Sequence, residues 1–442
     1  LLTKKPTPKY FTDKMLDVKQ ILNGVINLKD QEFLFELMVN VAALTLENPN
    51  VQNLLKDRTY KFDVIIGEYI LPAVLQCPFI WFSTIEPHSL ILNLVHGPPN
   101  PAYYGDYMRA HIAPYSFKTR VNELKSCIVN TWSDYSYFYD KEEEIYMKSI
   151  APIVKGQGRP VPNYNELKYN ASLLLGNSQI ATGSSIPLPP SYKHIGGYHI
   201  AEPVKPLPED LKKIMDNAKN GVIYFSMGSN LKSKDLPDDL KQSLLKVFGG
   251  LKQTVLWKFE EKLPGTPKNV HIVQWAPQQS ILAHPNLVLF VTHGGLLSVT
   301  EAIHFAAPLI VIPVFADQFV NAKRAQHKGF AVEVDLSYHM HEDLKVALDK
   351  VLGDLPKVKE LSVAYHDSPM KPKEALNFWV NHVVKTKGAP HLKSVALQVP
   401  LYQRVYLDLL AMIFVALIVL LLVVKKIICL VTGKKNTKVK KN

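Results

Sequence analysis

Short apolar runs rich in β-branched residues recur along the chain, separated by segments with helical spacing of apolar positions. This alternation is typical of parallel sheets whose strands are joined by crossover helices. Strands are predicted in the first half at 62–68, 78–83 and 172–178, and in the second half at 221–229, 254–260, 270–277, 287–295 and 309–318. The second set predicts a doubly wound α/β domain, whose ligands bind beyond the carboxyl ends of the strands.

Three stretches interrupt this pattern. Residues 84–170 are aromatic, rich in proline and without a clean period, so mobile helices and loops are expected. Prolines and charges in 196–211 predict a linker between two domains. Only eleven residues, 67–77, separate the first two strands, near the lower limit for a helical crossover. The N-terminal sheet is therefore expected to be incomplete, whether the domain is trimmed or the coding sequence is imperfectly assembled.

The C-terminal region carries the longest apolar run. Leu409 to Val424 is sixteen residues without a charge, or nineteen if the helix begins at Tyr406. That is about the length that spans a bilayer. A buried core helix is the alternative, but core helices have a polar face and this run has none. We expect a transmembrane helix at 406–424.

Positive charge is concentrated behind that run. The formal net charge is +12, but seven lysines lie in the last 18 residues without an acid, which leaves +5 on the other 424. The remainder is an ordinary globular surface, so no nucleic-acid partner is expected. Because the lysines crowd the C-terminal side of the apolar run, the basic tail, 425–442, is expected in the cytosol and the preceding residues across the membrane.

Several short features bear on the compartment. The terminal KVKKN resembles the dilysine-type retrieval signals of endoplasmic reticulum membrane proteins. Asn170 opens an N-x-S sequon, which is compatible with a lumenal site. The opening LLTKKPTPKYF has no Met and no apolar region, so the chain is expected to be a processed or truncated product. Cys77, Cys127 and Cys429 cannot build a disulfide framework, although a single pair stays open.

The stretch FVTHGGLLSVTEAIHF, 290–305, ends a predicted strand in His293-Gly294-Gly295. Glycines permit a sharp turn, and the amides at the start of the next helix then point at an anion such as a phosphate. His293 can add a hydrogen bond or a positive charge. The alternative is a capping box in which Ser298 and Glu301 satisfy backbone donors.

Other predicted strand ends carry side chains suited to a nucleotide sugar. Trp275 offers a stacking face and Gln278 an amide, while Asp317 and Gln318 can bind sugar hydroxyls and Ser229 ends the 221–229 strand. The alternatives are a core position for the Trp and a helix N-cap for Asp317-Gln318. An aromatic platform, a phosphate turn, a ribose-length acid and an amide at one sheet edge favour donor binding.

The segment WAPQQSILAHPNLVLFVTHGGLLSVTEAIHFAAPLIVIPVFADQ resembles the signature of the UDP-glycosyltransferases, family-1 enzymes of GT-B fold, and particularly their membrane-bound animal branch. The resemblance implies two Rossmann-like domains with a C-terminal transmembrane helix. It predicts a truncated acceptor-binding domain at 1–200 and a UDP-sugar-binding domain at 201–395. The resemblance is most specific between 221 and 330.

Carried over by position, the resemblance implies a role for each donor-site residue. Trp275 stacks on uracil, Gln278 contacts the nucleoside and Glu301 takes the ribose hydroxyls. The diphosphate lies on Ser229, His293 and the amides from Gly295 to Ser298, and the sugar on Asp317 and Gln318. Leu297 replaces the Asn that members often have, which removes one donor. Lys258 replaces an Arg usual in vertebrate glucuronosyltransferases, and a lysine has no bidentate fork, so UDP-glucose is favoured over UDP-glucuronate.

The resemblance also implies a catalytic pair, an N-terminal histidine base oriented by an acid. The acid position is Glu68, for which a solvated strand-end glutamate is the alternative, and residues 1–67 contain no histidine. The base is then missing unless a later histidine, such as His88, substitutes for it.

We expect an inverting UDP-glycosyltransferase of the endoplasmic reticulum that modifies hydroxyls of small lipophilic acceptors, with its acceptor site in 84–170. It would be a single-pass type I protein with lumenal catalytic domains, take a UDP-sugar as co-substrate, and need neither cofactor nor metal; a homo-oligomer stays open. The alternatives are a non-catalytic UDP-sugar-binding membrane protein or fragment, and a single-pass adhesion or receptor protein without a nucleotide site.

Overall fold

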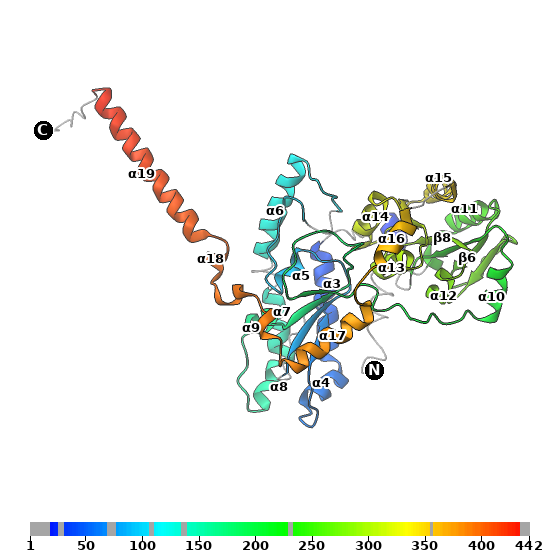
Figure 1. Ribbon diagram of the computed structural model, residues 1–442, viewed down its shortest axis with the longest axis horizontal. Coiled ribbons are helices and arrows are strands. Elements are labelled where there is room, and N and C mark those ends of the chain that lie inside the picture. Colours follow the sequence, from blue (N-terminus) through cyan, green and yellow to red (C-terminus); the bar gives the residue numbers. More distant parts are fainter. Residues whose placement is uncertain are drawn as a thin grey trace. The chain divides into compact units, whose positions relative to one another are not determined.

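The computed structural model describes residues 18–24, 31–68, 77–105, 110–133, 139–228, 233–353 and 357–433. The chain divides into two compact units, residues 1–393 and residues 394–442. The first holds two separate parallel sheets and the second a long helix (Figure 1). Cys77, Cys127 and Cys429 are all free.

The first sheet has four parallel strands in the order β1-β2-β3-β4. The strands are β1 (Ile65–Glu68), β2 (Phe79–Ser83), β3 (Leu173–Gly176) and β4 (Tyr192–His194). The three predicted strands are confirmed, and β4 was missed because it is only three residues long and lies near prolines. The short crossover falls largely on 69–76, outside the described residues.

Helices of the first half are more regular than the composition of 84–170 predicted. They are α2 (Val18–Leu22), α3 (Gln31–Glu47), α4 (Pro49–Lys56), α5 (Ser89–Asn93), α6 (Phe117–Ser133), α7 (Tyr139–Ser149), α8 (Ala151–Gly156) and α9 (Tyr164–Tyr169). The long helices α6 and α7 fall within 84–170, where helices and loops were expected, and they are more regular than the composition of that region indicated. In α6 the inward positions are polar, so the usual apolar signal for a packed helix is absent.

The second sheet has six parallel strands in the order β10-β9-β8-β5-β6-β7. Its strands are β5 (Val222–Ser226), β6 (Thr254–Lys258), β7 (Val270–Val273), β8 (Leu287–Thr292), β9 (Leu309–Val311) and β10 (Ala331–Glu333). Its helices are α10 (Glu209–Asp216), α11 (Asp238–Gly249), α12 (Gln278–Leu282), α13 (Leu296–His304), α14 (Gln318–His327), α15 (Met340–Gly353) and α16 (Lys357–His366), with a short η3 (Ser233–Asp235). All five predicted strands are confirmed, and only β10 was missed.

The second sheet is buried on both faces. Ile223 and Phe225 of β5 pack in one apolar cluster, whereas Val222 and Tyr224 of the same strand pack in another. This alternation follows from the two-residue period of a strand. Because both faces are covered, the strand reads as a continuous apolar run.

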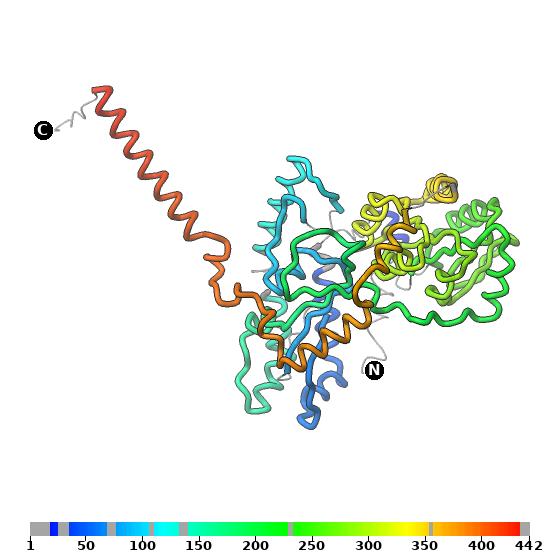
Figure 2. Tube along the Cα trace, viewed as in Figure 1, coloured from blue at the N-terminus to red at the C-terminus, as the bar shows by residue number. Residues whose placement is uncertain are grey.

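Helix α17 (Pro372–Lys385) packs against the first sheet, although the predicted 201–395 domain included it. Its Val383 is fully buried with Ile80 of β2 and Leu175 of β3. In Figure 2 the orange trace shows α17 beside the first sheet. The helix closes the apolar face of a sheet that precedes it by about 200 residues in sequence. The remaining domain boundaries stay a prediction.

The second unit contains η5 (Val395–Gln398), α18 (Leu401–Arg404) and α19 (Leu407–Val431), and the short η4 (Pro390–Leu392) precedes it. Helix α19 is a candidate membrane span. Its most apolar stretch of 18 residues has a mean hydropathy of 3.2, and no part of that stretch is buried. The core-helix alternative is therefore wrong. The helix runs seven residues beyond the predicted end at 424, because IICL continues the apolar pattern after Lys425 and Lys426. Residues 434–442 lie outside the described residues.

Candidate functional site

The His293-Gly294-Gly295 turn joins β8 to α13 and is built around the imidazole ring. A β-carbon would come within 2.7 Å of that ring at Gly228 and within 2.8 Å at Gly295. Gly294 has φ +85°, a left-handed conformation that glycine adopts freely. Burial, assisted by the charge of Lys258, lowers the pKa of His293 to about 4. The ring is therefore neutral near pH 7 and offers a hydrogen bond rather than a positive charge.

Helix α13 begins at Leu296, with Gly295 as its N-cap and no capping side chain. The capping-box alternative is wrong, because Ser298 and Glu301 both lie within the helix and are buried. Three residues apart, they share one face of the helix.

Glu301 is the centre of a polar network between two strand ends. Gln278 Nε2 donates to Ser298 Oγ at 3.0 Å and to Glu301 Oε2 at 2.6 Å. Glu301 Oε1 accepts from Gln279 Nε2 at 2.9 Å and lies 3.2 Å from His199 Nε2. Burial alone raises the pKa of Glu301, but the close contact with His199 and the hydrogen bonds from Gln278 and Gln279 outweigh it and bring the pKa below its ordinary value. The structure thus holds a buried, ionised carboxylate beside Ser298.

Three of these residues were predicted together, and two were missed. Gln279 repeats the amide of Gln278 and could have been found from that repetition. His199 lies in the predicted linker, where nothing in the sequence marked it as part of the site.

Asn321, which follows β9, hydrogen-bonds both to Asp317 and to the His293-Gly294-Gly295 turn. Asn321 Nδ2 donates to Asp317 Oδ2 at 2.7 Å and to the Gly294 carbonyl at 3.0 Å. Asp317 is the N-cap residue of α14, as the alternative supposed, but its side chain makes no capping hydrogen bond. Burial raises the pKa of Asp317 to about 6, against the hydrogen bond from Asn321. Gln318 Oε1 accepts from the amides of residues 314–315. Asn321 was missed, although its spacing of four from Asp317 is a usable signal.

Trp275 lies in the loop between β7 and α12 with 70% of its surface exposed, so the core alternative is wrong. Lys258 Nζ donates to the Gly228 carbonyl at 2.5 Å and fixes the turn after β5. Ser229 lies outside the described residues. The ligand roles assigned to these residues stay predictions.

Glu68 and Asn170 both lie at exposed positions. Glu68 Oε1 accepts from Thr84 Oγ1 at 2.5 Å, and Asn170 Oδ1 accepts from Lys393 Nζ at 2.5 Å. Catalysis by Glu68 and glycosylation of Asn170 stay predictions. Within the described ranges, no group of three or more His, Cys, Asp and Glu residues is arranged to hold a metal ion.

A cavity of about 350 Å³ lies between the loops beyond the first sheet and helix α14. Its aromatic and apolar lining includes Tyr103, Tyr104, Ile112 and Tyr115, and its polar lining includes His88, His111, Arg324, His327 and Lys328. Residues from both halves of the first unit therefore line one cavity.

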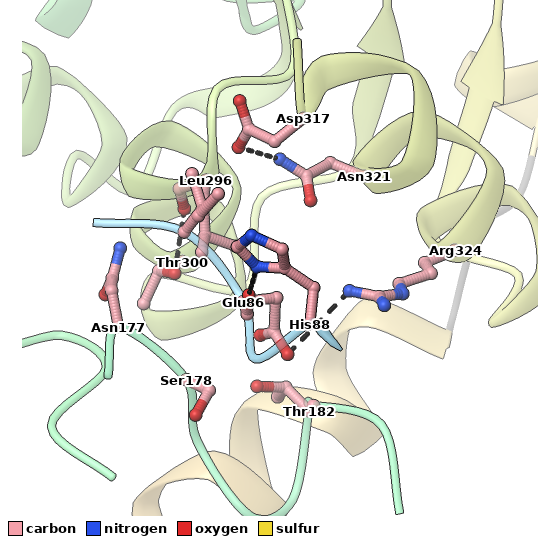
Figure 3. A network of polar contacts seen from close by, with 12 residues as sticks. Glu86, His88, Asn177, Ser178, Thr182, Leu296, Thr300, Asp317, Asn321 and Arg324 are labelled. Atoms are coloured by element: carbon pink, nitrogen blue, oxygen red, sulfur yellow. Dashed lines mark hydrogen bonds and ion pairs between the residues drawn. The ribbon is translucent and has the colours of Figure 1, made fainter. Parts of the chain in front are cut away.

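Glu86 contacts two residues that line this cavity, His88 and Arg324 (Figure 3). His88 Nδ1 lies 3.0 Å from the Glu86 carbonyl, and Arg324 Nη1 lies 3.7 Å from the Glu86 carboxylate. Burial raises the pKa of Glu86, while Arg324 and Lys328 oppose that rise. Burial lowers the pKa of His88 to about 4. Sequence reasoning missed the contact of Glu86 with Arg324, because it joins segments far apart in the chain.

Comparisons with known proteins identify the family to which the chain is similar. The family described as UDP-glucoronosyl and UDP-glucosyl transferase matches residues 10–442. UDP-glucosyltransferase 2 of Dactylopius coccus is 31% identical, over 99% of this chain and 88% of its own length. UDP-glucuronosyltransferase 2B15 of Rattus norvegicus is 32% identical, over 81% and 68%. The solved structure of the kitacinnamycin glycotransferase has a TM-score of 0.52 at 17% identity, covering 80% of this chain and 83% of that one, and shows the GT-B fold.

Proposed function

Because the chain belongs to the UDP-glucuronosyl and UDP-glucosyl transferase family, we propose that it transfers glucose from UDP-glucose to a hydroxyl of a small lipophilic acceptor, with inversion. The chain is a UDP-glycosyltransferase of GT-B fold. Beyond this activity, we propose the donor sugar, the class of acceptor and the cellular location.

The observation that carries the donor half is the buried Glu301 carboxylate next to Ser298 and Gln278. An ionised acid of this kind can accept two hydroxyl donors of a ribose. The amides of Gln278 and Gln279 donate to this carboxylate. These hydrogen bonds hold it in position, and the ribose hydroxyls would share or replace them.

The diphosphate would lie over the turn before α13. The free amides of a helix N-terminus attract phosphate, and neutral His293 adds a hydrogen bond. Trp275, with its exposed indole, is available to stack on the base. Like any UDP-sugar, the donor enters as co-substrate, and the proposed reaction uses no further cofactor.

Glucose is favoured over glucuronate by the setting of Lys258. Its ammonium is engaged with the Gly228 carbonyl, and a lysine has no planar fork for a sugar carboxylate. Asp317 and Gln318 supply a carboxylate and an amide for neutral sugar hydroxyls.

The acceptor is proposed to bind in the 350 Å³ cavity, whose tyrosines and Ile112 offer an apolar wall. Proton transfer from its hydroxyl is proposed to involve His88, which lines that cavity. If Nδ1 donates to the Glu86 carbonyl, Nε2 is the basic nitrogen. Glu68 is not among the residues that line the cavity.

The chain is further proposed to be a single-pass type I protein of the endoplasmic reticulum with lumenal catalytic domains and a cytosolic tail. Candidate span α19 and the lysines behind it support this orientation. Conjugation of lipophilic compounds there would serve detoxification.

The proposal is tested with the complete protein in membranes, UDP-glucose or UDP-glucuronate, and a broad panel of phenols. Glucoside formation is expected. UDP binding without product on any phenol would favour the non-catalytic alternative. Absence of a UDP-induced thermal shift, unchanged by Glu301→Ala, would exclude both and leave the adhesion-type alternative.

A further inference from the structure

Helix α6 exposes apolar side chains and buries polar ones, the reverse of an ordinary surface helix. Phe117, Val121, Leu124 and Ile128 are 75%, 49%, 51% and 62% exposed. Their spacing of four, three and four residues places them in one stripe along the helix. A continuous stripe of large apolar side chains in water is unfavourable, because each of them is stabilised by burial.

The opposite face of α6 is polar and turned inward. Glu123 and Ser126 are buried at 1% and 6% exposure, and Thr119 and Asn130 on the same face are half-buried. Glu123 Oε1 lies 2.6 Å from His111 Nδ1. The inward face of the helix is therefore polar and is joined to His111 through Glu123, and the apolar stripe is directed outward.

Basic residues flank the stripe. Lys118 and Lys125 lie along one side and Arg120 along the other, by helical spacing, and all three are exposed. The one acid of α6, Glu123, is on the buried face. An apolar stripe bordered by cations and free of exposed acids matches the boundary between the acyl chains and the anionic headgroups of a bilayer.

We propose that α6 is an interfacial helix that inserts its apolar stripe into an anionic lipid surface. A protein partner is less consistent with this face, because its exposed basic border would need an acidic rim around an apolar groove. Since the same chain carries candidate span α19, a bilayer is available to the first unit without a separate recruitment step.

The proposal places the lipid surface next to the acceptor cavity. His111, which pairs with Glu123 of α6, also lines that cavity, as do Ile112 and Tyr115 just before the helix. A lipophilic acceptor dissolved in the bilayer would thus be close to the space proposed to bind it. The membrane contact itself does not depend on catalysis.

The test uses the full chain reconstituted in vesicles of phosphatidylcholine and phosphatidylserine, in which the candidate span α19 is expected to anchor it. In a background with Cys77, Cys127 and Cys429 replaced by serine, a nitrobenzoxadiazole fluorophore is attached at Leu124→Cys. The matched control is Val346→Cys on α15, which is 69% exposed. UDP binding verifies that each labelled protein is folded.

The expected result is blue-shifted emission at position 124 that brominated acyl chains quench, with neither effect at position 346. Replacing Lys118, Arg120 and Lys125 together by glutamine is expected to reduce the quenching. Emission at 124 that stays water-like and accessible to iodide would overturn the proposal. Shielding from iodide without quenching by brominated lipid would also overturn it, since a protein then covers the stripe. Quenching that is unchanged in the triple variant would refute the role of anionic lipid.

Discussion

Gln278 and Glu301, which follow two different strands, are joined by a hydrogen bond of 2.6 Å from Gln278 Nε2 to Glu301 Oε2. The bond links the start of α12 to the interior of α13, so the two strand ends act as one polar surface. Because the carboxylate is ionised and already hydrogen-bonded, it is positioned before a ligand arrives. Such preorganisation lowers the ordering cost of binding.

Replacing this carboxylate is expected to weaken donor binding. Glu301→Gln removes a charged acceptor, and a hydrogen bond to a charged group is worth about 2 kcal/mol, or roughly 30-fold in Kd. Isothermal titration with UDP measures the change. Glu374→Gln, on the exposed side of α17, serves as the matched control and should bind UDP normally. Equal affinity of the two variants would contradict the ribose role of Glu301.

Asp317 predicts a pH dependence that is specific to the sugar. Its pKa is raised to about 6 by burial, so the carboxylate is ionised above that pH and protonated below it. The affinity for UDP-glucose relative to UDP should therefore fall as the pH decreases from about 7.5 to about 5. His293 remains neutral over this range, since its pKa is lowered to about 4.

Asp317→Asn separates this effect from general acid sensitivity. The variant should show a pH-independent ratio of the two affinities. If the wild-type ratio is already constant across the range, Asp317 does not bind the sugar in its ionised form.

Gly295 is expected to be intolerant of a methyl group because of His293. A β-carbon there would lie 2.8 Å from His293 Nε2, although the backbone is not in the left-handed region. Gly295→Ala should displace the ring and weaken UDP binding, with a cost of about 1–3 kcal/mol. Gly156→Ala is the control, since nothing beyond its chain neighbours and its own helix backbone lies within 4 Å of the position that its added methyl group would take. Thermal unfolding and UDP titration of both variants distinguish loss of the fold from loss of the site.

The second sheet was predictable because burial on both faces leaves long apolar runs, as in β5 and β8. The polar strand ends were predictable too, since parallel strands bring Gln278, Ser298 and Glu301 to one edge. Short strands such as β4 and β10 carry too few residues for a periodic signal. Helix α6 escaped prediction because Glu123 and Ser126 face inward, which reverses the pattern on which helix prediction relies. Pairs such as Glu86 and Arg324 depend on tertiary packing alone.

The buried ion pair of Lys168 and Glu142 is expected to matter for stability. Lys168 Nζ lies 2.7 Å from Glu142 Oε2, and both side chains are about 5% exposed. Tyr164 OH also donates to that carboxylate oxygen, at 2.8 Å. Lys168→Met leaves a buried charge without its cation and should lower the free energy of unfolding by about 3–5 kcal/mol.

The matched control is Lys148→Met, which breaks a surface pair with Glu47 at 2.8 Å. A surface pair contributes about 0–1 kcal/mol. Denaturant unfolding of both variants measures the difference. A similar loss in the two would show that the buried pair adds nothing beyond an exposed one.

His88 and Glu68 are the two candidates for a catalytic role in proton transfer from the acceptor hydroxyl. His88 lines the cavity, whereas Glu68 is exposed at the end of β1 and hydrogen-bonds to Thr84. His88→Gln is expected to lower kcat by roughly 10²- to 10⁴-fold, the range for loss of a general base. The affinity for UDP should not change, because neither residue belongs to the donor network around Glu301. Glu68→Gln is the matched comparison and should lower kcat less. Full activity of the His88 variant together with loss of activity in the Glu68 variant would reverse the assignment and return the acid at the end of β1 to the catalytic role.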